Sequence, residues 1–109
     1  MARLAVKTDK VQLPSGAIAV EGSLGGTMDI TTMAIFEKEM ADLMKANIPY
    51  YYFDCGKLEY INSSGMGLLL QLSDKLAGRG GKILFYNIPK KIEALIKMLG
   101  LHNILKLYG

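Results

Sequence analysis

Two adjacent serines, Ser63 and Ser64, stand between an asparagine and a glycine in the stretch YINSSGMGLLL, residues 60–70. A serine or asparagine before an apolar helix is a typical N-cap, because its side-chain oxygen accepts a backbone N–H of the first turn. A serine hydroxyl at a helix start is also accessible to a kinase, and the positive end of the helix dipole favours the added phosphate. The two roles are compatible, and the residue pattern alone leaves both open.

Serine catalysis finds little support in the sequence. A serine nucleophile needs a base, usually a histidine held by a carboxylate, and the only histidine, His102, lies far from the serines along the chain. NSSGMG is not the Gly-x-Ser-x-Gly elbow of hydrolases. The acidic residues occur singly, and a lone cysteine, Cys55, allows no multi-cysteine metal site and is expected in the core. We therefore expect no catalytic residue, no metal and no cofactor.

The composition limits the kind of protein. The 109 residues, 50% of them hydrophobic, suit one domain over residues 1–109. No apolar run approaches the ~20 residues of a membrane span, and the first residues contain no signal core. The net charge of +3 is scattered and forms no basic stripe, so we expect neither a membrane nor nucleic acid as a partner. A single cysteine suits a reducing cytoplasm.

The elements before the serines follow from hydrophobic periodicity. Residues 3–8 and 17–24 alternate around the turn sequence LPSG and predict a hairpin. The glycine-rich GSLGGTMD, residues 22–29, predicts a link to a helix over residues 30–47, capped by Asp29 or Thr31. Residues 50–55 form an aromatic run that predicts a buried strand. The apolar stripe of the predicted helix comprises Met33, Phe36, Met40, Leu43 and Met44.

Beyond the serines the pattern alternates again between helix and strand. A helix is expected from Gly65 to the glycines of GRGG, then a buried strand over residues 82–88, then a helix that begins at Pro89 and ends near Gly100. Residues 103–108 predict a short strand or a helical turn. The stripes of the two helices comprise Leu69, Leu72 and Leu76, and then Ile92, Leu95, Ile96 and Leu99.

This order of elements predicts an α/β fold. Parallel strands need crossover helices between them, so we expect a mixed, largely parallel sheet of about four to five strands packed with helices. Residues 51–54 and 83–86 are short, apolar and followed by helices, and we expect them to be adjacent central strands. The serines would then lie where a central strand passes into a helix.

Several motifs resemble a known family. FDCGKLEYINSSGMGLLL, residues 53–70, resembles the central strand, loop and helix of STAS domains, the family of bacterial anti-sigma factor antagonists, and keeps the family spacing from Asp54 to Gly67. VEGSL resembles the family's early Gly-x-Leu strand end, and residues 80–108 resemble its closing glycine pair, strand, helix and Gly-Leu ending. Two positions depart from the family, because Asn62 and Gly25 stand where Asp is frequent.

The resemblance implies a function. In the family, the serine directly after the Asp/Asn is phosphorylated by an anti-sigma factor that is a serine kinase, and the unphosphorylated form binds this partner to free a sigma factor. Here that residue is Ser63. The resemblance thus implies a cytoplasmic, non-enzymatic regulator of transcription, with a serine phosphatase as a further candidate partner. Because Asn62 replaces an acid, a STAS scaffold or ligand-sensing module without a kinase cycle is the alternative, and a small phosphate-binding enzyme fragment is a distant third.

The partner surface is expected around Ser63. Met66 and Leu70 lie beside the apolar stripe of the helix and widen its apolar face, which predicts a partner contact or, equally, gap filling under the neighbouring helix. Ser64 is expected to be better placed than Ser63 to cap the helix. The predicted partner contacts are Asn62, Ser64, Gly65, Met66 and Leu70.

Overall fold

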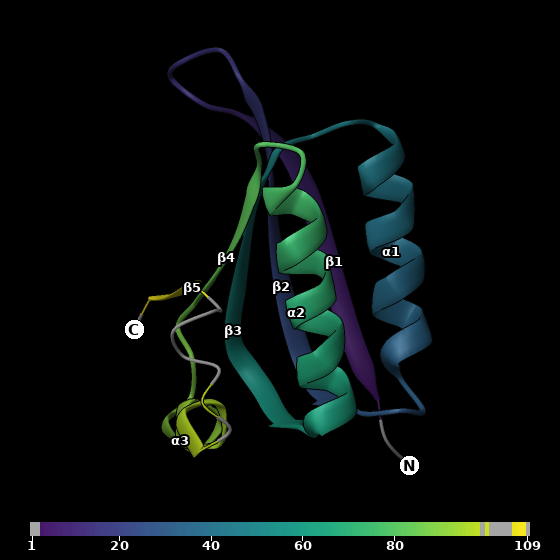
Figure 1. Ribbon diagram of the computed structural model, residues 1–109, viewed down its shortest axis with the longest axis vertical. Coiled ribbons are helices and arrows are strands. Elements are labelled where there is room, and N and C mark those ends of the chain that lie inside the picture. Colours follow the sequence, from purple (N-terminus) through teal and green to yellow (C-terminus); the bar gives the residue numbers. More distant parts are fainter. Residues whose placement is uncertain (1–2, 99, 101–105, 109) are drawn as a thin grey trace.

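The computed structural model describes residues 3–98, 100 and 106–108, which contain five strands and three helices (Figure 1). The elements are β1 (Leu4–Gln12), β2 (Ile18–Met28), α1 (Met33–Lys45), β3 (Tyr50–Ile61), α2 (Ser63–Ala77), β4 (Lys82–Tyr86), α3 (Lys90–Met98) and β5 (Lys106–Tyr108). The predicted alternation of strands and helices is confirmed, and part of the predicted terminal strand is present as β5. Leu99 and His102 lie outside the described residues.

The strands form one sheet in the order β1-β2-β3-β4-β5. β1 and β2 are antiparallel, as the predicted hairpin requires, and the remaining neighbours are parallel. Residues 51–54 of β3 pair with residues 83–86 of β4, and both strands have a neighbour on each side. The predicted mixed, largely parallel sheet with these two segments adjacent inside it is therefore confirmed.

Two strands are longer than predicted. The glycine-rich segment expected to be a link belongs to β2 as far as Met28, and the loop expected before α2 is the second half of β3. Glycine disfavours strands by propensity, which is why the sequence pattern suggested a link. Pairing between β2 and β3, which extends from Ala19–Tyr50 to Met28–Ile61, overrides that preference.

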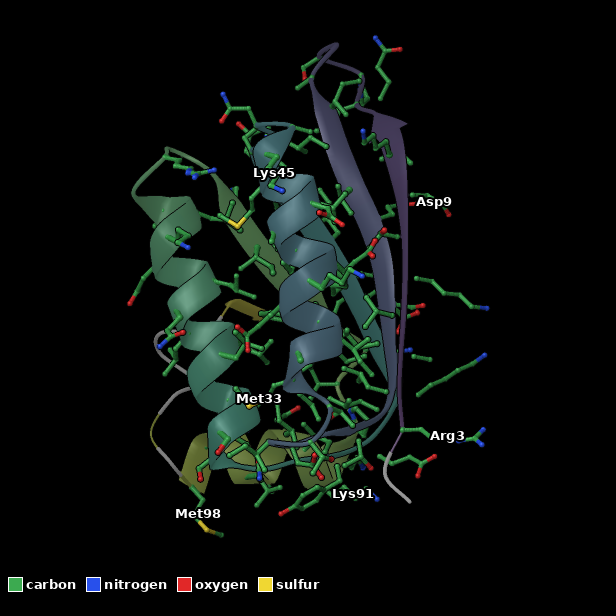
Figure 2. All side chains as sticks on the ribbon, turned by 90° about the vertical axis from the view of Figure 1, so that its right-hand side faces the viewer. Arg3, Asp9, Met33, Lys45, Lys91 and Met98 are labelled. Carbon is green, nitrogen blue, oxygen red and sulfur yellow. The ribbon has the colours of Figure 1, made fainter. Side chains whose placement is uncertain are left out.

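The core lies on one face of the sheet. α1 and α2 lie side by side over this face, and α3 crosses the end of the sheet where α2 begins (Figures 1 and 2). Phe53 of β3 occupies the centre, with its ring centroid 5.5 Å from that of Phe36 on α1 and 6.3 Å from that of Phe85 on β4. On the opposite face, Tyr52 and Asp54 are only half-buried. The helices therefore hold the sheet from one side and leave its other face open.

Candidate functional site

Ser63 is the first residue of α2, and its side chain is exposed. Asn62 precedes it in extended conformation, and the Asn62 Oδ1 accepts the Gly65 N–H at 3.0 Å. Asn62 is thus the N-cap and Ser64 is the second helical residue. The expectation that Ser64 is better placed to cap is wrong, because the helix starts one residue earlier and the amide that needs a partner is reached from Asn62.

The first turn of α2 presents backbone donors beside the Ser63 hydroxyl. The Gly65 N–H is bound by the cap, and the Met66 N–H donates to the Asn62 carbonyl at 3.0 Å. The amides of Ser63 and Ser64 come before the first intrahelical hydrogen bond and point out of the helix end. With the helix dipole they favour negative charge at this position. A phosphate on Ser63 would therefore be electrostatically favoured.

Directly behind the serines, α2 packs closely on the sheet. Gly65 is buried, and a Cβ at this position would lie 2.8 Å from both the Ile61 Cγ1 and the Met28 carbonyl oxygen. Met66 is only 1% exposed and belongs to the core. The expectation that the Met66 side chain lies on an exposed partner surface is wrong, because the side chain points between α2 and the sheet. Gly65 likewise lies beneath the surface that the partner would meet.

The remaining predicted contacts lie nearer to solvent. Asn62 and Ser64 are half-buried at the helix start. Leu70 is half-buried too and packs against the core without being part of it. The partner contact of Leu70 stays a prediction. Because Leu70 is half-buried against the core, packing alone also explains its position.

The loop between β2 and α1 adds a surface that the sequence did not predict. The Met28 carbonyl accepts the Asn62 N–H at 3.2 Å, so this loop lies beside the start of α2. Ile30 in the loop is 77% exposed, and Tyr60, three residues before Ser63, is 48% exposed. In the sequence, Ile30 stands between the polar residues Asp29 and Thr31 and outside the apolar stripe of α1. This position was the available sequence signal that Ile30 is exposed. These two side chains give the Ser63 end of the molecule an apolar rim.

Asp29 contributes a fixed negative charge to the same loop. The Thr31 hydroxyl and the Thr31 N–H donate to the Asp29 Oδ1 at 2.6 and 2.8 Å. These hydrogen bonds, the hydroxyl first, lower the pKa of the Asp29 carboxyl. The residue that precedes α1 is Thr32, and it makes no side-chain cap bond. The prediction that Asp29 or Thr31 is the N-cap of this helix is therefore wrong.

The single cysteine, Cys55, was expected to be a core residue rather than a reactive one. Cys55 is 2% exposed, as predicted, and burial followed by the nearby Asp54 charge raises the pKa of its thiol to about 12. A thiol that keeps its proton is a poor nucleophile.

Within residues 3–98, 100 and 106–108, no three metal-ligating side chains come together. The same part of the chain contains no helix long and apolar enough to cross a membrane.

A family model decides the relationship of this chain to known proteins. The STAS domain model matches residues 19–109, which is most of the chain. The chain belongs to the STAS domain family. The family inferred from the motif around Ser63 is therefore confirmed. Strand β1 precedes the matched segment.

Solved structures share the fold. An anti-sigma factor antagonist from Mycobacterium paratuberculosis matches with a TM-score of 0.76 and 18% identity over 95% of this chain and 86% of its own. The anti-sigma factor antagonist SpoIIAA in its unphosphorylated form matches with a TM-score of 0.74 and 16% identity over 94% of this chain and 87% of its own. The Bacillus cell fate determinant SpoIIAA in the phosphorylated form matches with a TM-score of 0.67 and 19% identity over 94% of this chain and 90% of its own. A search of curated sequences gives no match.

Proposed function

We propose that this STAS domain is an anti-sigma factor antagonist, which binds an anti-sigma factor with serine-kinase activity and so releases a sigma factor. The observation that carries the proposal is the exposed Ser63 at the first position of α2, directly after the N-cap Asn62. The comparison with solved structures supports the proposal, because this chain shares its fold with anti-sigma factor antagonists, one of them in a phosphorylated form. Phosphorylation of Ser63 is the proposed off-switch.

The switch acts on binding rather than on the fold. A phosphate at a helix N-terminus gains at most about 2 kcal/mol from the dipole, and at the exposed Ser63 it displaces no core side chain. Against a partner without a matching cation, burial of the same phosphate costs several kcal/mol. Each ~1.4 kcal/mol is tenfold in affinity. The phosphorylated domain therefore keeps its structure and loses its partner.

The partner footprint in this proposal is the rim around Ser63. Ile30 and Tyr60 supply exposed apolar contacts, and Asn62 and Ser64 supply polar ones. Exposed apolar side chains near a polar centre are typical of protein interfaces. The domain needs no catalytic group of its own, because the kinase supplies the phosphoryl transfer, and a serine phosphatase would restore the binding form.

Phosphorylation in vitro tests the proposal directly. The protein is incubated with ATP and candidate anti-sigma kinases, and its peptides are examined by mass spectrometry. We expect one phosphate, on Ser63, in the parent and in Ser64→Ala, and none in Ser63→Ala. Labelling of Ser64 instead, or no labelling by any kinase that modifies its own antagonist, would overturn the kinase cycle.

A ligand-sensing module is the second candidate, favoured by a hollow on the open face of the sheet. The hollow has a volume of about 440 Å³, and the polar side chains that border it are Lys7, Ser23, Asp54, Lys57 and Asn87. The two ammonium groups outweigh the single Asp54 carboxylate, so the hollow suits an anionic ligand. Thermal unfolding in the presence of nucleotides and small anions tests this function, since a specific ligand raises the midpoint without any kinase. An unchanged midpoint with every compound removes this candidate.

A further inference from the structure

The ladder between β2 and β3 is irregular at two places before the site, first between Ser23 and Gly25 of β2 and again between Gly26 and Thr27, and the first irregularity is the one tied to the end of β4. Ser23 pairs with Asp54, but the next pairs are Gly25 with Lys57 and Gly26 with Leu58. Two residues of β3, Cys55 and Gly56, thus face the single Leu24 of β2. This arrangement is a β-bulge, which bends a strand and changes the direction of the residues that follow it.

One carboxylate oxygen holds this bulge. The Gly56 N–H donates to the Asp54 Oδ1 at 2.8 Å, and the Asn87 Nδ2 donates to the same oxygen at 3.2 Å. Asn87 directly follows β4 and has a φ of 57°, in the left-handed region. The Asp54 side chain therefore ties the bulge of β3 to the point where the chain leaves β4. We call Asp54, Gly56 and Asn87 the bulge clamp.

Gly56 is required by the clamp for a steric reason. A Cβ at this position would collide with the side-chain amide of Asn87 and would lie 3.1 Å from the Asp54 Oδ1. A larger residue would push the Asn87 donor away from the carboxylate. The spacing of Asp54 and Gly56, two residues apart in the family-like motif, is thus explained by a contact between two strands.

The clamp is the last cross-link of β3 to β4 before the site. The pairing of β3 with β4 ends at Asp54 and Tyr86, and residues 57–61 pair with β2 alone. In this second half β3 bends toward the start of α2 (Figure 1). After the bulge, Leu58 and Ile61 point into the core, and Ile61 leads directly to Asn62 and Ser63. The direction of these residues decides where the Ser63 hydroxyl lies.

We propose that Asp54 is a positioning residue for Ser63: through Gly56 and Asn87 it sets the bend of β3 that presents the serine to the kinase. The proposal rests on the proposed function of Ser63. Asp54 lies on the open face of the sheet, nine residues ahead of Ser63, and acts through the strand. A displacement of about 1 Å at a reacting group can reduce a rate about a hundredfold, so a modest change in the bend has a measurable effect.

Kinase kinetics are the first test. Asp54→Ala removes the acceptor, Asn87→Gly removes the donor but tolerates the left-handed backbone, and Asp54→Asn keeps an acceptor oxygen without the charge. We expect both removals to lower kcat for Ser63 phosphorylation at least tenfold with KM changed less than threefold, and Asp54→Asn to restore it. Glu21→Ala, which removes an exposed carboxylate from the same face, is the matched control and should match the parent. Parental rates in Asp54→Ala, or no rescue in Asp54→Asn, would overturn the proposal.

Amide hydrogen exchange is the second test and needs no partner. In Asp54→Ala and Asn87→Gly we expect exchange at residues 57–61 to accelerate at least tenfold and the amide resonances of residues 62–66 to shift, with residues 51–53 unchanged. Equal acceleration in residues 51–53 would show general destabilisation and overturn the positioning role. If no kinase labels the parent, the proposed function fails, whereas the exchange experiment still decides whether the clamp positions the start of α2.

Discussion

Among single residues, Ser63 can be changed with little effect on folding. Ser63→Ala should bind the partner as the parent does and accept no phosphate. Ser63→Asp should bind about tenfold more weakly or worse, because a carboxylate reproduces part of the charge of the phosphate at the contact surface. Both variants keep the Asn62 cap, so their free energies of unfolding should stay within about 1 kcal/mol of the parent. Titration calorimetry with the partner checks the affinities, and unchanged affinity of Ser63→Asp would contradict the switch.

Cys55 gives a prediction for pH that also belongs to one residue. Its thiol pKa is about 12 in the folded domain, whereas an unfolded thiol titrates near its ordinary value of about 8.5. A raised pKa stabilises the folded state fully below the unfolded value, and this contribution is lost as the pH rises from about 9 toward 12. We therefore expect the free energy of unfolding to fall between about pH 9 and 11, and to fall less steeply in Cys55→Ala. Urea unfolding across this range measures both slopes, and equal slopes would show that the thiol is not protected.

Among the elements, α2 carries two glycines that provide a matched pair. Gly65→Ala would bring a Cβ to 2.8 Å from the Met28 carbonyl oxygen and from Ile61, so α2 must shift, at a cost of about 1–3 kcal/mol. A Cβ on Gly67 would meet no atom within 4 Å, and alanine there should stabilise the helix by about 1 kcal/mol. Thermal unfolding should thus move in opposite directions for the two variants. A neutral Gly65→Ala would mean that α2 is free to slide on β2.

The partner surface also depends on the elements, because their packing decides which side chains are covered. Ile30→Lys should weaken partner binding about tenfold and leave the thermal midpoint nearly unchanged, since the side chain is 77% exposed. Met66→Lys buries an unpaired charge at a position that is 1% exposed and should destabilise the domain by about 3–5 kcal/mol. Calorimetric unfolding and partner titration are both needed. Strong destabilisation by Ile30→Lys would show that the β2–α1 loop is not a free surface.

The contrast between Ile30 and Met66 shows where prediction from the sequence stops. Helical spacing gives the direction of Met66 relative to its own helix axis, but not how closely α2 approaches the sheet. That approach depends on Gly65, whose missing side chain allows contact with Met28. The serine site itself was predictable, because capping and the family-like spacing are local properties. The neighbouring loop was not, because only the pairing of β2 with β3 brings it beside α2.

For the molecule as a whole, periodicity predicted the order of elements, the parallel pairing and the central position of β3. It did not predict the lengths of β2 and β3. Glycines at residues 22, 25 and 26 and at residue 56 suggest interruptions, yet each lies in a strand. Close packing explains Gly22 and Gly56, since a Cβ on Gly22 would overlap the Phe53 ring at the centre of the core and a Cβ on Gly56 would collide with the Asn87 side-chain amide. Tertiary contacts across strands, absent from any local window, decide these positions.

The whole fold should be the same in both phosphorylation states of Ser63. Ser63 is exposed, and the large core side chains, including Met28 and Met66 near it, lie behind the first turn of α2. The dipole contribution of at most ~2 kcal/mol is small beside a typical domain stability of about 5–15 kcal/mol.

We therefore expect phosphorylation of Ser63 to shift amide resonances at residues 60–66 and in the adjoining β2–α1 loop, and to leave those of β1 and α3 in place. The thermal midpoint should change by no more than about 8–16 °C, since the dipole contributes at most about 2 kcal/mol and each kcal/mol corresponds to roughly 4–8 °C in a domain of this size. Heteronuclear NMR of the two forms measures both regions in one experiment. Shifts that spread across the sheet would mean that the phosphate remodels the domain, and the loss of partner binding would then have a conformational origin rather than an electrostatic one at the contact surface.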